Sequence, residues 1–139
     1  MAEYTAVLLQ NVAAGQNVLF TESPIPCTRG NVHHREGSGV FRLGGGNGRA
    51  RYKVTYGGNI AIPTGGTVDP ISIALSLDGE TLASATAIVT PAAVGDFFNV
   101  FVAVFVDVTC GCCATVAVEN TSGQAIDVQN SNLIIERVC

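Results

Sequence analysis

The sequence predicts an all-β domain, an antiparallel β-sandwich or jelly roll of about ten short strands. Apolar and polar residues alternate in many segments, and clusters of Gly, Pro, Asn and Asp separate these segments from one another. No helix of three turns is visible, and the sequence contains no internal repeat. At 139 residues the chain has the size of one domain with a core of its own.

The predicted strand arrangement depends most on the most apolar segment, residues 97–120. From residue 97 to 108, Val residues occupy one face, while the other face carries Phe97, Phe101 and Phe105. Such β-branched and aromatic side chains favour a strand, and a strand that is apolar on both faces needs cover on both. We therefore expect the Val face in the domain core and the three Phe residues at a contact between subunits. Residues 109–113 predict the tip of a hairpin that returns along residues 114–120.

Turn residues delimit the other expected strands. In chain order these are residues 16–21, 32–36, 39–43, 49–62, 71–77, 81–89, 125–129 and 132–138, with a weak candidate at 6–9. Pro24 and Pro26 should end the first strand, Gly57-Gly58 should form a bulge or bend, and Asp78-Gly79 is a strong hairpin-turn signal. We expect residues 1–16 to be a lead-in or attachment segment and residues 17–139 to be the head domain.

Composition favours an assembled protein. Hydrophobic residues make up 47% of the chain and charged residues only 13%, against about 25% charged in an average soluble domain. The formal charge of −4 argues against nucleic acid as a partner. We expect no signal peptide, because Glu3 stands where a positive charge would be, and no membrane span, because Asn99 and Asp107 interrupt the longest apolar run.

The order of these elements resembles the jelly roll of complement-type globular heads and of the tumour necrosis factor superfamily, which includes head domains of bacterial and phage fibres. The matching segments are the short hairpin at 32–43, RYKVTY from residue 51, IALSLDG from residue 73, CATVAV from residue 113 and SNLIIERV from residue 131. The resemblance covers residues 17–138 and implies a homotrimer around a three-fold axis. The chain departs from the family's aromatic-rich core, having six Phe, three Tyr and no Trp, and it has no collagen-like stalk.

Three phrases also resemble small virion proteins of gut Firmicutes phages and prophages: NVHHREGSG from residue 31, VTPAAVGDFFNVF from residue 89 and CGCCATVAVENTS from residue 110. The resemblance implies a structural virion protein, either a trimeric capsid decoration or the head of a head fibre. Its partners would be copies of itself and the phage capsid, with loops available for a host-surface glycan. It would be made in the bacterial cytoplasm and would reside in the virion.

The five cysteines are the sharpest local chemical signal. Cys110, Cys112 and Cys113 could bind zinc with Cys27 or with His33-His34, although the spacing is not that of a zinc ribbon. Disulfides among Cys27, Cys110, Cys112, Cys113 and Cys139, within or between subunits, are a second alternative. Reduced thiols are favoured, because no secretory signal is expected. If the cysteines do link neighbouring subunits, the chain would instead belong to an extracellular bacterial filament or a spore-surface layer.

No constellation of residues predicts an enzyme or a cofactor. A Cys nucleophile with His33 or His34 as its base lacks an oxyanion loop, and adjacent residues of a strand point to opposite faces. The glycines at 44–48 lack the Lys-Ser/Thr pair of a phosphate loop. Four aspartates, Asp69, Asp78, Asp96 and Asp107, lack the spacing of a calcium loop. Asn120-Thr121-Ser122 fits the glycosylation pattern, which matters only in a eukaryotic secretory pathway.

Overall fold

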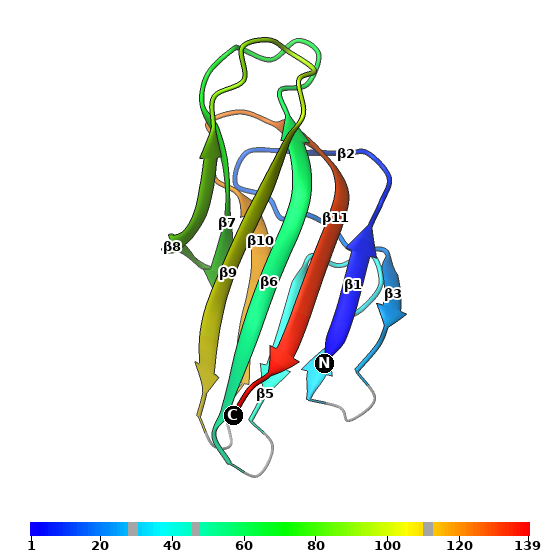
Figure 1. Cartoon of the computed structure of the whole chain (residues 1–139), viewed down its shortest axis with the longest axis vertical. Helices are drawn as coiled ribbons and strands as arrows, with labels where there is room; N and C mark the ends of the chain where they lie inside the picture. Colours follow the sequence, from blue (N-terminus) through cyan, green and yellow to red (C-terminus); the bar gives the residue numbers. More distant parts are fainter. Residues whose placement is uncertain (28–30, 46–47, 110–112) are drawn as a thin grey trace.

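Two antiparallel sheets pack face to face (Figure 1). The computed structural model describes residues 1–27, 31–45, 48–109 and 113–139. Sheet A contains β1 (Ala2–Ala6), β2 (Gln10–Val12), β3 (Glu22–Ile25), β6 (Ala50–Ala61), β9 (Phe98–Val108) and β11 (Ile126–Arg137). Sheet B contains β4 (Val32–His33), β5 (Val40–Gly44), β7 (Ile71–Leu77), β8 (Glu80–Val89) and β10 (Cys113–Asn120). The described residues form eleven strands and no helix, which confirms the predicted all-β jelly-roll sandwich.

The strand orders are β3-β1-β11-β6-β9 in sheet A, with β2 also paired to β11, and β4-β5-β10-β7-β8 in sheet B. Strands β9 and β8 are therefore the edge strands of the two sheets on the same side of the sandwich. No helix long and apolar enough to cross a membrane occurs in the part of the chain that the structure describes.

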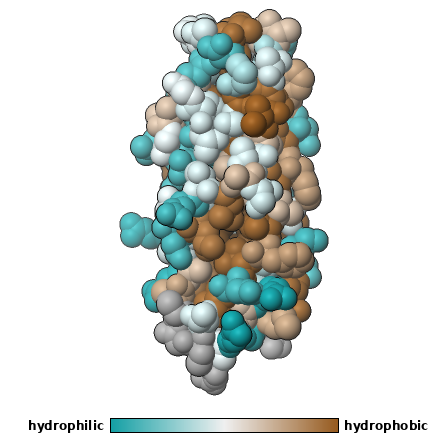
Figure 2. Space-filling model, turned by 90° about the vertical axis from the view of Figure 1, so that its left-hand side faces the viewer, coloured by the Kyte–Doolittle hydropathy of each residue, from teal (hydrophilic) through white to brown (hydrophobic). Residues whose placement is uncertain are grey.

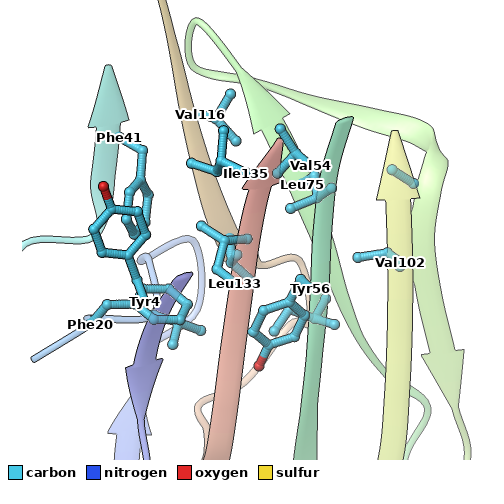
Figure 3. Close-up of a cluster of buried hydrophobic side chains, with 14 of the residues drawn as sticks. Tyr4, Phe20, Phe41, Val54, Tyr56, Leu75, Val102, Val116, Leu133 and Ile135 are labelled. Atoms are coloured by element: carbon cyan, nitrogen blue, oxygen red, sulfur yellow. The ribbon is translucent and has the colours of Figure 1, made fainter. Parts of the chain in front are cut away.

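Alternation along the strands builds the core between the sheets (Figure 3). In β6, Tyr52, Val54 and Tyr56 point inward and are buried, as the sequence predicted. A second part of the core is aromatic: the rings of Phe20 and Phe41 lie 5.3 Å apart in an edge-on arrangement. Such tilted pairs are the favoured geometry of packed aromatic rings.

The N-terminal strands differ from the prediction. Residues 16–21 form no strand and make only the isolated bridges Asn17↔Glu119 and Phe20↔Ser38. Residues 1–16, expected as a lead-in, instead contain β1 and β2, and β1 pairs with β11 over its whole length. Pro24 does not stop a strand but lies within β3, which is tolerated because β3 is the edge of sheet A.

The predicted hairpin of residues 97–120 is wrong. Strand β9 pairs with β6 in sheet A, whereas β10 pairs with β5 and β7 in sheet B, so the connection crosses between the sheets. The expected cysteine tip includes residues 110–112, which lie outside the described residues. A turn signal in the sequence shows only that the chain changes direction, and the crossover depends on partners far away in the chain.

Two short predicted hairpins are confirmed. Strand β4 pairs with β5, and although β4 is shorter than expected, Val32 lies opposite Leu43. Strand β7 pairs with β8 through Asp78 and Gly79, whose φ angles of 52° and 89° are the left-handed values that such a turn requires.

The bulge predicted at Gly57-Gly58 lies instead on the neighbouring strand. Pairing between β6 and β9 continues without interruption across both glycines, opposite Phe101 and Val100. The register shift occurs in β11, between Gln129 and Asn132, where Asn130 has a φ of 55°. The two strands expected at 125–129 and 132–138 are therefore one bulged strand.

The buried phenol of Tyr56 makes the stability of the fold decrease at alkaline pH. Its hydroxyl lies 2.9 Å from Ser131 Oγ, and burial raises the pKa of Tyr56 to about 12. In the unfolded chain this phenol ionises near pH 10. The stabilisation from keeping it neutral is therefore complete below about pH 10 and is lost as the pH rises to 12, at about 1.4 kcal/mol per pH unit.

We expect urea denaturation to show this decline in wild type and a shallower decline in Tyr56→Phe, which has no phenol at this position. Tyr4 and Tyr52 also have pKa values raised mainly by burial, and both variants share that background. Equal slopes of stability against pH for the two proteins between pH 10 and 12 would contradict the assignment to Tyr56.

Candidate subunit interface

The outward face of β9 carries the aromatic residues that the sequence placed at a subunit contact. Phe101 and Phe105 are 65% and 62% exposed, and Phe97, just before the strand, is 42% exposed. The opposite face of the same strand is the predicted Val face, where Val100, Val102, Val106 and Val108 are buried in the core. None of the described residues covers the aromatic face.

The neighbouring strand β6 gives this face its shape. Phe101 lies opposite Gly57, and Phe105 lies opposite Lys53. A Cβ atom placed on Gly57 would meet no heavy atom within 4 Å, so the ring of Phe101 does not cover the glycine. An uncovered glycine therefore lies beside an exposed aromatic ring, and such an open apolar surface suits packing against another surface.

An ion pair bounds the aromatic face at its lower end. Arg51 on β6 donates two hydrogen bonds to Asp107 on β9, at 2.7 and 3.2 Å. The hydrogen bond from Arg51 lowers the pKa of Asp107, and the same bond raises the pKa of Arg51. Both groups are exposed and screened by solvent, so the pair adds little stability and mainly marks a polar border beside Phe105.

Apolar side chains continue around the edge of the sandwich. Figure 2, which looks onto the side that carries β8 and β9, shows apolar residues along much of the height of this side. Ile88 on β8 is 67% exposed, and Phe98 at the start of β9 is 40% exposed. The candidate interface thus comprises the aromatic face of β9 and the adjoining apolar edge.

A row of carboxamides crosses the same outer face above Phe101, and sequence reasoning missed it. Asn99 on β9, Asn59 on β6 and Asn130 on β11 are linked in series by hydrogen bonds between their side chains. The three residues are far apart in the sequence, so no local pattern could have revealed them. Gly57 was noticed only as a bulge candidate, and its place opposite Phe101 depends on the strand register.

The cysteines and histidines do not assemble into a metal site among the described residues, where no group of three or more His, Cys, Asp or Glu is placed to hold an ion. Cys113 and Cys139 are exposed, Cys27 is half-buried, and Cys110 and Cys112 lie outside the described residues. His33 is exposed, whereas the ring of His34 stacks on Phe41 with 4.2 Å between centroids. The zinc and disulfide alternatives therefore remain predictions.

Two other sequence candidates have structural roles. The glycosylation candidate Asn120 is fully buried, and its amide donates to the carbonyls of Val12 and Gln124 at 3.0 and 2.9 Å. A glycan could not reach it in the folded chain. The Gln124 side chain accepts a hydrogen bond from the backbone N–H of Thr67 and donates one to its carbonyl. These two bonds fix the loop between β6 and β7.

An open groove of 430 Å³ lies beside this loop, lined by Asn11, Gln124, Ala125 and residues 63–67. Its lining contains no side chain that ionises near neutral pH, so it offers no group for acid–base catalysis.

Of the four candidate calcium aspartates, Asp107 is in the ion pair with Arg51, and Asp78 accepts a hydrogen bond from the backbone of Thr115 at 2.9 Å.

Comparison with solved structures defines the class of fold. The chain is similar to the Eiger TNF of S. frugiperda, with a TM-score of 0.71 and 14% identity over 99% of this chain and 91% of that one. It is also similar to the globular domain of the zebrafish complement 1qA protein, with a TM-score of 0.59 and 11% identity over 96% and 94% of the two chains. No protein-family model and no curated protein sequence matches the chain. The protein therefore has the jelly-roll fold of tumour necrosis factor and complement globular domains, as its sequence predicted.

Proposed function

We propose that the chain is a structural virion protein: a homotrimeric head domain that decorates a phage capsid or caps a head fibre. The observation that carries the proposal is the aromatic face of β9, where Phe101 and Phe105 are more than half exposed although four Val residues of the opposite face are buried in the core. Burying two such rings in each subunit would stabilise an assembly by roughly 2 kcal/mol or more per ring.

Fold and composition support the same proposal. Domains with this jelly roll are often trimers, and a three-fold assembly would cover the apolar side seen in Figure 2. A chain with only 13% charged residues also suits a protein whose surface is partly buried by its own copies. The virion location rests on the resemblance of residues 31–39, 89–101 and 110–122 to small phage proteins, and the loops would then be available for a host-surface glycan.

A second candidate, a subunit of an extracellular filament or spore-surface layer linked by disulfides, has one specific observation in its favour. The described cysteines lie near one end of the sandwich. Cys27 lines a pocket with Tyr52 and Arg137, Cys113 pairs with Gly44, and the carbonyl of Cys139 accepts from the backbone of Arg51. Cys139 is exposed there, where a neighbouring subunit could reach it.

The mass of the protein in dilute solution tests the assembly. Light scattering on purified protein should give three times the chain mass of 14.3 kDa, both with and without reductant. A monomer would refute the trimer. A ladder of larger species that collapses on reduction would favour the disulfide-linked filament.

The virion location needs a separate test. Phage particles induced from the source bacterium and purified by density should contain the chain by mass spectrometry, and antibodies against it should label the capsid in electron micrographs. Label confined to cell-surface filaments or spores would replace the virion proposal with the second candidate.

A further inference from the structure

The carboxamide row on the outer face of sheet A has a fixed direction. Asn99 Nδ2 donates to Asn59 Oδ1 at 3.1 Å, and Asn59 Nδ2 donates to Asn130 Oδ1 at 3.2 Å. Asn99 Nδ2 also lies 3.4 Å from the carbonyl oxygen of Gly58. Because a carbonyl can only accept, this contact orients the Asn99 nitrogen toward β6, and the direction of the whole row follows.

The bulge in β11 positions the last member of the row. In register, Asn59 lies opposite Gln129, but the amide of Asn59 bonds to Asn130, the residue in the left-handed conformation at the bulge. Asn is one of the few residues other than Gly that adopts this conformation readily. The bulge thus places a third carboxamide in line with the other two.

The two ends of the row are complementary and incomplete. Asn99 Oδ1, an acceptor, and Asn130 Nδ2, a donor, have no hydrogen-bond partner within the described ranges. Both residues are exposed in the single chain, and Asn99 is two residues from Phe101 on the same face of β9. If a second copy covers Phe101 and extends across β6 to β11, both ends of the row lose water and need a protein partner.

We propose that Asn130 of one copy donates to Asn99 of the next, so that three rows close into a ring that fixes how the subunits align. This inference rests on the homotrimer proposed above. Contacts between exposed Phe side chains are not directional and would tolerate sliding of one subunit along another. A buried polar row is satisfied in one alignment only, as a buried Asn fixes the register of a coiled coil, so it selects that alignment.

The substitution Asn130→Asp tests the ring with almost no change of shape. The aspartate keeps an acceptor for Asn59 and tolerates the left-handed backbone, but it replaces the donor that faces the next copy with an oxygen. Losing one hydrogen bond and leaving an unpaired carboxylate at each of three contacts should raise the concentration at which the trimer half-dissociates about a hundredfold or more, measured by light scattering over a dilution series. The melting temperature of the isolated subunit should stay unchanged.

Gln16→Glu is the matched control, because it adds the same charge at an exposed position beside the end of β10 in sheet B, away from the row. It should change the half-dissociation concentration by less than about threefold. Lowering the pH below about 4 should restore the Asn130→Asp trimer, because the protonated carboxyl is again a donor. If wild type is trimeric and the two variants dissociate alike, the ring is wrong and the trimer stands. If wild type is a monomer, the proposed assembly itself is wrong.

Discussion

Phe101→Asp is expected to convert the trimer to monomers at micromolar concentration while leaving the stability of each subunit nearly unchanged. The ring is 65% exposed in the single chain, so its removal takes little from the core. In the trimer, the substitution would place three carboxylates in an apolar contact without partners. An unpaired buried charge costs several kcal/mol, which is enough to shift association by orders of magnitude. Light scattering and thermal melting would measure the two effects separately.

Val40→Asp is the control for this substitution. Val40 is 43% exposed and lies on β5 of sheet B, away from β9 and from the carboxamide row of sheet A. The same change of an exposed apolar residue to aspartate should leave the trimer intact. A Phe101→Asp protein that still sediments as a trimer would show that the aromatic face of β9 is not the subunit contact.

The sequence was most informative about long strands with regular alternation. Strand β6 could be predicted because Tyr52, Val54 and Tyr56 alternate with polar residues, and the faces of β9 could be assigned because Val fills one of them. The N-terminal strand β1 gave a weaker signal, because two of its three buried residues, Ala2 and Ala6, are small. Their burial depends on pairing with β11, at the other end of the chain.

Sheet membership could not be predicted from the sequence. The glycine and cysteines after β9 indicate a change of direction, but β9 is held by eleven paired positions on β6 and not by the strand that follows it. Alternation gives the two faces of a strand, and it contains no information on which distant strand lies alongside. The carboxamide row depends on this pairing, because Asn59 and Asn99 share an outer face only when β6 and β9 are neighbours.

Gly58→Ala is expected to destabilise the subunit strongly, by about 2–3 kcal/mol, whereas Gly57→Ala should be neutral or slightly stabilising. A Cβ on Gly58 would overlap Tyr56 Oη and lie 2.9 Å from Tyr56 Cζ, atoms of a rigid side chain that is fully buried. Inserting a methyl group into a packed core typically costs this much. Gly57, its neighbour on the same strand, points to the open outer face, where replacement by Ala reduces the entropy of the unfolded chain.

Removing the obstructing hydroxyl should partly restore the Gly58→Ala protein. In the double variant Tyr56→Phe, Gly58→Ala the closest atom is gone, although the ring Cζ at position 56 would still lie 2.9 Å and Ser131 Oγ 3.1 Å from the new methyl group. The loss in urea midpoint relative to wild type should therefore be smaller for the double variant than the sum of the losses in the two single variants. Substitutions of residues in contact are not additive. Additive effects would mean that the methyl group clashes with something other than the Tyr56 hydroxyl, and a stable Gly58→Ala protein would show that the core around Tyr56 can shift to accept it.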